Sequence, residues 1–129
     1  MGKVRDTPMI LIGVLGLIGV VAAAAGSHWL DPNLSDKLKL AWDHAVQFNL
    51  IHTAAMMAIF AALKIAEPES SAARWLNRSF VLLFAGTTIF CGTVYAICLG
   101  VPGKQVGHFA PVGGITMMLG WVSVAIAGF

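Results

Sequence analysis

Four long stretches of apolar residues dominate the chain and limit the folds open to it. Apart from Lys64 near the end of the second, the segments 9–28, 44–65, 79–99 and 110–128 contain no Asp, Glu, Lys or Arg. Each is close to the ~20 residues that a helix needs to cross the hydrocarbon core of a bilayer. The segments predict an all-α fold, a four-helix transmembrane bundle in which residues 1–129 form one domain.

The composition separates this chain from soluble helical proteins. Hydrophobic residues make up 58% of the sequence and charged residues only 11%, whereas about a quarter of the residues of a soluble domain are charged. A soluble bundle of the same helices would have too few polar residues to cover it. The net charge of +2 is too small to indicate nucleic-acid binding. We therefore expect the lipid bilayer to surround most of the chain.

The segment between the first two spans carries signals for a turn and then for a helix start. Asp31-Pro32-Asn33 is typical of a turn, and Ser35 is a suitable N-cap. Apolar residues then recur at helical spacing through Leu38 and Trp42. We predict a short interfacial helix between spans one and two, which continues into span two.

Basic residues on the connecting segments predict the orientation in the membrane. The residues Lys3, Arg5, Lys64, Arg74 and Arg78 would flank the spans on one side, and Lys37, Lys39 and Lys104 on the other. Because cytoplasmic segments carry the excess of Lys and Arg, both termini are expected on the cytoplasmic or matrix side. The expected location is a bacterial inner (plasma) membrane, with the mitochondrial inner membrane as the alternative. Residues 22–26 also resemble a signal-peptide cleavage region, but we interpret the segment as a retained first span.

Small residues on one face of a helix allow a neighbouring helix to approach closely in a membrane. Glycines recur at intervals of three in the first span and also occur in the third and fourth spans. The glycines expected to serve helix packing are Gly13, Gly16, Gly19, Gly26, Gly92, Gly113, Gly114 and Gly120. The general frequency of glycine in membrane helices is the alternative explanation.

A few polar side chains lie within the apolar spans, where each one needs a partner. The set expected to form a polar layer, or to bind a ligand, is His28, Gln47, Asn49, His52 and Tyr95. His52 would lie roughly 10 Å inside the hydrocarbon region, and Tyr95 at a similar depth. The predicted arrangement is a hydrogen bond from His52 to Tyr95 or to a threonine of another helix.

The histidines also allow a metal site as an alternative. His28, His44 and His52 would gather near one membrane surface, with Cys98 or Met117 close by, and imidazole and thioether ligands suit copper or zinc. No HxxxH or CxxC spacing supports such a site, so no cofactor is predicted. The two cysteines are seven residues apart in the third span, too far for a disulfide. We expect them to be small buried groups.

Several stretches of the chain resemble one known family. They are Ala25-Gly26-Ser27-His28, the run from Ala45 to His52, Phe90-Cys91-Gly92-Thr93-Val94-Tyr95, and Ala110-Pro111-Val112-Gly113-Gly114 with Gly120-Trp121 after it. In this order and spacing they resemble the domain of unknown function 423 family, which includes the eukaryotic transmembrane protein 256. The first span departs from the usual Gly-Ala-Phe-Gly-Ala-His-Gly run of that family, because alanines precede His28 and Trp29 follows it. The resemblance implies a four-helix membrane protein whose activity is unassigned.

The residues within the spans favour a non-catalytic role. The sequence has no glycine-rich phosphate loop, and Ser27 beside His28 is adjacency only, because neighbours on a helix point apart. No charged residue lies at the middle of a span, where transporters generally carry one. We expect an auxiliary or structural subunit that packs against a larger membrane protein complex or against its own copies. The alternative is a stand-alone binder of a metal ion or small polar ligand at the histidines.

Overall fold

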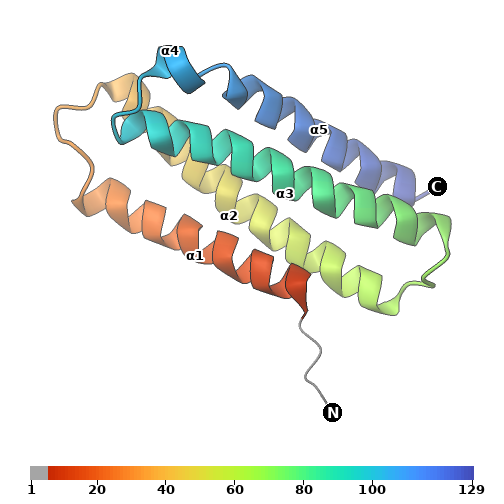
Figure 1. Cartoon of the computed structure of the whole chain (residues 1–129). Coiled ribbons are helices and arrows are strands. Elements are labelled where there is room, and N and C mark those ends of the chain that lie inside the picture. The colour runs from red at the N-terminus through yellow and green to blue at the C-terminus, as the bar shows by residue number, and fades with distance from the viewer. Residues whose placement is uncertain (1–5) are drawn as a thin grey trace.

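A computed structural model describes residues 6–129 as a set of helices joined by short connections (Figure 1). The helices are α1 (Thr7–His28), α2 (Asp36–Ile65), α3 (Ser71–Cys98), α4 (Gly103–Val106) and α5 (Phe109–Ala127). Four of these, α1, α2, α3 and α5, are long and apolar enough to cross a membrane. The prediction of an all-α fold with four long apolar helices is therefore confirmed.

The segment after Ser35 is helical and continues into the second span, as predicted, but it is the first part of α2 and not a separate short helix between spans one and two. Ser35 caps α2, and its hydroxyl accepts a hydrogen bond from the backbone N–H of Leu38 at 3.3 Å. The helix is continuous from Asp36 to Ile65, and Trp42 and Ala45 are both buried on the face that packs inward. The short helix of the structure is α4, which lies between the third and fourth spans. It follows the turn at Pro102.

The third long helix begins earlier than the apolar run within it. α3 starts at Ser71, eight residues before the predicted span, and Ser70 caps it by accepting a hydrogen bond from the N–H of Ala73 at 3.1 Å. Its first two turns carry Arg74 and Arg78, and the guanidinium of Arg78 stacks on the ring of Trp75. These turns lie outside the apolar part of the helix, as the first turns of α2 do.

The long helices pack in chain order. Extensive interfaces join α1 to α2, α2 to α3, and α3 to α5, and consecutive long helices run in opposite directions (Figure 1). The start of α1 and the end of α5 therefore lie at the same end of the molecule, and α2 and α5 run parallel to one another. This arrangement places a groove between α2 and α5, with α3 behind it.

The buried core is small and the outer surface is apolar. Met56 and Leu83 are fully buried at the centre, with Ile12 and Met117 against them from the outer helices. Large apolar side chains also cover the outside of the helices, and Leu17, for example, is 64% exposed. An apolar exterior of this kind suits lipid rather than water.

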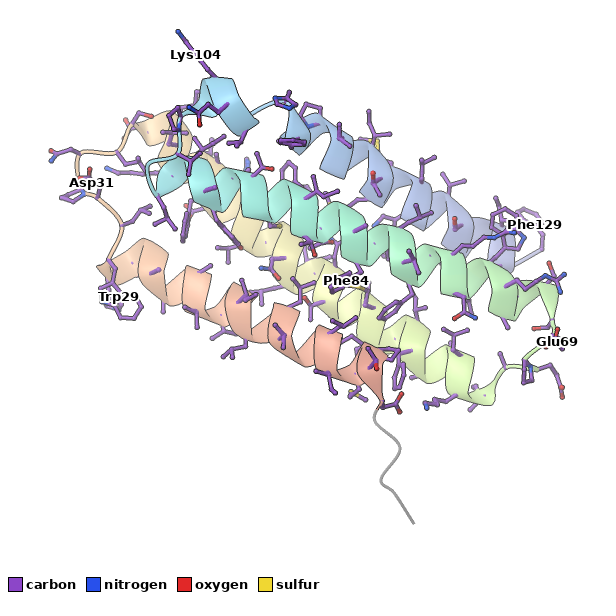
Figure 2. All side chains as sticks on the ribbon, viewed as in Figure 1. Trp29, Asp31, Glu69, Phe84, Lys104 and Phe129 are labelled. Atoms are coloured by element: carbon purple, nitrogen blue, oxygen red, sulfur yellow. The ribbon has the colours of Figure 1, made fainter. Side chains whose placement is uncertain are left out.

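Charged and polar side chains collect at the two ends. Figure 2 shows Asp31 and Lys104 at one end and Glu69 at the other. This separation leaves the middle of the helices to the hydrocarbon region.

The basic residues used to predict orientation divide between these ends. Lys64, Arg74 and Arg78 lie at the end where α5 stops, and Lys37, Lys39 and Lys104 lie at the opposite end. Lys3 and Arg5 are outside the described residues. At the first of these ends Lys64 pairs with Asp6 at 3.0 Å, and both side chains are exposed, so the pair contributes little, about 0–1 kcal/mol. Among the described residues, the two ends thus carry equal numbers of these basic residues. The orientation in the membrane therefore stays a prediction.

Candidate functional site

The first polar contact of the interior joins α1 to α2 through an indole. Trp42 is 3% exposed, and its Nε1–H donates to the backbone carbonyl of Ala22 at 2.9 Å. The contact depends on Gly26, because a Cβ atom built there would lie 2.8 Å from Trp42 Nε1. Glycine at this position therefore makes room for the indole that joins the two helices.

The second polar contact joins α2 to α3 about two turns deeper along α2. Asn49 is completely buried, and its Nδ2 donates to the hydroxyl of Tyr95 at 3.2 Å. Thr53 donates to the carbonyl of Asn49 at 2.7 Å, and the Tyr95 ring packs on Trp42 with centroids 4.8 Å apart. Gly19 of α1 gives space for this group, because a Cβ there would lie 3.1 Å from Asn49 Oδ1.

His52 does not bond Tyr95 or a threonine, so that prediction is wrong. It is 4% exposed, its Nδ1 lies 2.7 Å from the Phe48 carbonyl, and its Nε2 lies 3.1 Å from Nε1 of Trp121. An indole can only donate and a carbonyl can only accept. These partners assign the neutral tautomer in which Nδ1–H donates to Phe48 and Nε2 accepts from Trp121. Both ring nitrogens are then used within the protein.

The other residues of the predicted polar layer do not join this interior. His28 and Gln47 are exposed, and so is His44, the third histidine of the alternative metal site. Within residues 6–129 no group of three or more His, Cys, Asp or Glu side chains is placed to hold a metal ion. The structure thus does not bring His28, His44 and His52 together.

The two cysteines are free and buried, and both contact α2. The thiol of Cys91 donates to the carbonyl of Ala45 at 3.2 Å, and that of Cys98 to the carbonyl of Leu38 at 3.4 Å. The two acceptors are seven residues apart, as the two thiols are, so the pairs follow the antiparallel crossing of α2 and α3. A small donor that reaches the neighbouring backbone suits two closely packed helices.

The predicted packing glycines separate into two groups. A Cβ built on Gly16, Gly19, Gly26, Gly113 or Gly120 would lie within 3.3 Å of a neighbouring helix, whereas one built on Gly13, Gly92 or Gly114 would meet no atom within 4 Å. The tightest approach joins α3 to α5, where the added Cβ of Gly113 would lie 2.5 Å from the backbone nitrogen of Phe90. Gly86, which was not among the predicted packing glycines, takes part in the same contact, because a Cβ built there would lie 2.6 Å from the backbone nitrogen of Met117.

An apolar groove opens on the side of α2 and α5 and is here called the lateral cleft. It has a volume of about 410 Å³ and is lined by Phe48, Ile51, His52, Phe90, Gly114, Met117, Met118 and Trp121. Its walls are α2 and α5, and Phe90 of α3 lies behind them. A second groove of about 370 Å³ lies between α1 and α3, next to Trp42 and Tyr95, and is more open.

Sequence reasoning did not predict the hydrogen bonds made by the two indoles, that of the buried Trp42 and that of Trp121, which is 44% exposed. Trp42 and Trp121 supply the donors that pair with Ala22 and His52. A signal was available, because an indole N–H within an apolar helix needs an acceptor as much as a histidine does.

Comparison with known proteins gives a consistent result over nearly the whole chain. The model of the family described as "Protein of unknown function (DUF423)" matches residues 22–114. A UPF0382 membrane protein of Schizosaccharomyces pombe is 31% identical over 116 residues, which cover 86% of this chain and 92% of that protein. A UPF0382 membrane protein of Staphylococcus aureus is 29% identical over 121 residues, 93% of each chain.

A bacterial relative also carries a location in its name. The UPF0382 inner membrane protein YgdD of Escherichia coli K12 is 26% identical over 120 residues, which cover 92% of this chain and 86% of that protein. No solved structure is significantly similar to the chain. With its four long apolar helices, the chain is a small integral membrane protein that belongs to the DUF423 (UPF0382) family.

Proposed function

We propose that the protein is a non-catalytic accessory subunit that binds a transmembrane helix of a larger membrane complex through one face of α2. This face consists of Leu40, His44, Gln47, Ile51, Ala54, Ala58, Ala61 and Ile65, and is here called the outward face of α2. The residues alternate in steps of four and three, and every one is exposed. A 4-3 spacing forms one continuous line on a helix, as required for packing against a second helix.

Gln47 is the observation that carries this proposal. Nine residues at 100° each place it opposite Met56, which is fully buried, so its amide points directly away from the core. It lies just inside the predicted edge of the hydrocarbon region. No hydrogen bond joins its amide to another side chain among residues 6–129. Amides at membrane depth are costly without a partner and commonly bond across helices.

The deeper part of the same face favours close approach. Ala54, Ala58 and Ala61 follow Gln47 with the 4-3 spacing and are exposed. Small residues allow the backbone of a neighbouring helix to come near, and van der Waals packing then contributes to association in lipid. A polar residue above a stripe of small residues would fix both the position and the register of the partner.

The interior supports a packing role rather than a chemical one. Asn49 bonds Tyr95, and both nitrogens of His52 have partners within the chain. The connections outside the membrane are short, for example residues 29–35 and 66–70. This arrangement supports helix packing as the main activity of the chain.

Isolation from gently solubilised membranes tests the proposal. The wild-type protein is expected to elute together with a larger complex, and Gln47→Leu and Ala58→Phe are expected to release it. Ala23→Phe is the matched control, because Ala23 is exposed on α1 and outside the outward face of α2. Elution as a monomer at native expression, or release by the control as readily as by Ala58→Phe, would contradict the proposal. Elution as a dimer of the chain alone would show that the partner is a second copy of the chain and would contradict a larger complex.

A further inference from the structure

Two arginines near the start of α3, here called the arginine pair, face outward and have no carboxylate partner. Leu83, which is fully buried, lies nine residues after Arg74, and 100° per residue places the two on opposite sides of the helix. Arg78 follows one turn later on the same side as Arg74, and both residues are exposed. In the described part of the chain, the only ion pair joins Lys64 to Asp6. No carboxylate there neutralises the guanidinium charges of the arginine pair.

Both guanidinium groups are held in place by contacts that leave hydrogen-bond donors unused. The guanidinium carbon of Arg78 lies 4.6 Å from the centre of the Trp75 ring, a distance typical of a cation–π contact. Stacking uses the flat face of the guanidinium and leaves the N–H donors at its edge. Arg74 donates from Nη1 to the backbone carbonyl of Glu69 at 2.8 Å, which leaves most of its N–H donors unused. The arginine pair thus presents oriented donors on the outer side of α3.

The depth of the arginine pair corresponds to the headgroup layer of a bilayer. The apolar run of α3 begins directly after Arg78, and residues 79–99 span ~30 Å as a helix, which is the thickness of the hydrocarbon core. Arg74 lies ~6 Å further out, within the ~5–7 Å that the headgroups add on each side. Val81, nearly one turn deeper than Arg78 on the same side, is 64% exposed. The surface directly below the arginine pair therefore faces lipid chains.

The other charged side chains at this end do not neutralise the arginine pair. Lys64 and Asp6 compensate one another at 3.0 Å. Glu67 and Glu69 precede the first residue of α3, and neither carboxylate makes an ion pair with an arginine in the described part of the chain. The local charge at the arginine pair is therefore positive, which suits an anionic group at the membrane surface.

We propose that Arg74, Trp75 and Arg78 form a binding site for the phosphate of an anionic phospholipid in the leaflet on the side where α3 begins. The two guanidinium groups donate to the phosphate oxygens, and an acyl chain of the same lipid lies along α3 beside Val81. Two uncompensated positive charges favour a lipid with net negative charge over a zwitterionic one. The site is on a different helix from the outward face of α2 and does not depend on the function proposed above.

Titration of the full chain in detergent micelles with phosphatidylglycerol gives the first test, with bound lipid counted by native mass spectrometry. The double variant Arg74→Gln/Arg78→Gln is expected to bind this lipid ~30-fold more weakly than the wild type, about 2 kcal/mol, because each basic residue near an anionic surface contributes about 1 kcal/mol. Lys37→Gln/Lys104→Gln is the matched control, since it removes two exposed positive charges at the opposite end, and it is expected to bind as the wild type does. Equal binding by the wild type and the arginine variant, or equal losses in the two double variants, would overturn the proposal.

Two further ligands distinguish an anionic lipid from other sources of phosphate. Phosphatidylcholine carries a phosphate but no net charge, so the wild type is expected to bind it more weakly than phosphatidylglycerol, and the arginine variant to bind both lipids equally. Millimolar inorganic phosphate, compared with chloride at equal ionic strength, is expected to leave the lipid bound, because it has no acyl chain to lie beside Val81. Displacement by phosphate would assign the site to a free anion. That result, or equal binding of the two lipids by the wild type, would contradict the proposal.

Trp75→Leu tests the geometry of the site rather than its charge. The variant keeps both arginines but removes the ring that positions Arg78. It is expected to bind phosphatidylglycerol ~2- to 5-fold more weakly, since a cation–π contact at an exposed site contributes about 0.5–1 kcal/mol. Unchanged binding would leave only a general attraction between charges and would contradict a built site. Release of a partner protein by the arginine variant, with lipid binding unchanged, would assign the arginine pair to a partner's carboxylate and overturn the proposal.

Discussion

At the scale of single residues, the interior is organised by side chains that reach a neighbouring helix and by glycines that let them do so. Trp42 reaches the carbonyl of Ala22 across the position of Gly26, and Asn49 reaches Tyr95 beside Gly19. In lipid the alternative to such a bond is an unpaired polar group, although the measured gain per bond is only about 0.6 kcal/mol on average. Their main effect is therefore to fix which residues face one another.

The role of Gly26 can be tested by adding a single methyl group. Gly26→Ala would place a Cβ 2.8 Å from the buried Trp42 ring, and overpacking of this kind costs about 1–3 kcal/mol. Gly13→Ala adds the same methyl group where no atom lies within 4 Å. It should leave the thermal unfolding temperature in detergent unchanged or slightly higher, since alanine favours the helix by about 1 kcal/mol. Equal unfolding temperatures for the two variants would show that the packing of the Trp42 indole does not require a glycine at position 26.

Two buried polar residues should respond in opposite ways to apolar replacement. Asn49→Leu removes the donor to Tyr95, and we expect a loss of about 1 kcal/mol of stability. The hydroxyl of Thr87 is buried without a hydrogen-bond partner in the described part of the chain, so Thr87→Val should be neutral or stabilising. Denaturation in mixed micelles measures both effects. A stability loss for Thr87→Val as large as that for Asn49→Leu would indicate that the hydroxyl has a partner.

At the scale of helices, the closest interface is that between α3 and α5. Gly86 and Gly113 bring the two backbones together, and Leu83 fills the space beside Gly120. The interface leaves α5 without an extensive contact with α2 other than through the pair of His52 and Trp121. The position of α5 therefore depends on a few small residues, and the lateral cleft depends on the position of α5.

Neighbouring glycines on α5 offer a matched comparison for this interface. Gly113→Ala would place a Cβ 2.5 Å from the backbone of Phe90, whereas Gly114→Ala would meet no atom within 4 Å. Because backbone cannot move aside as a flexible side chain does, we expect Gly113→Ala to lose about 1–3 kcal/mol and Gly114→Ala to lose none. Thermal unfolding in the same detergent checks this. A destabilised Gly114→Ala with an unaffected Gly113→Ala would place the α3 contact on the wrong side of α5.

The four long helices could be predicted from the sequence, but which face of each helix meets its neighbour could not. Apolar length is a property of one segment, so the four spans were found. Whether His52 faces Tyr95 or Trp121 depends on the rotation and offset of two helices, which no single segment contains. The same limit explains why Gly86 was missed, and why Gln47 was predicted in the interior although it faces outward. The misplaced short helix has a different cause, since a cap at Ser35 opens a long helix as well as a short one.

At the scale of the whole molecule, the chain is a layer of four apolar rods with polar ends. The ends are marked by Asp31 and Lys104 on one side and by Glu69 on the other (Figure 2). The outer surfaces are apolar, and the polar side chains between them are mostly paired within the chain. This distribution is that of a protein whose surroundings are lipid.

Labelling of single cysteines from the two sides of a sealed membrane tests this account most directly. Asn33→Cys, Glu69→Cys and Lys104→Cys each add one exposed thiol, since the native Cys91 and Cys98 are buried. With an impermeant maleimide, we predict that positions 33 and 104 react from one side and position 69 only from the other, the cytoplasmic or matrix side. Reaction of positions 33 and 69 from the same side would mean that α2 does not cross the bilayer, and would contradict the account.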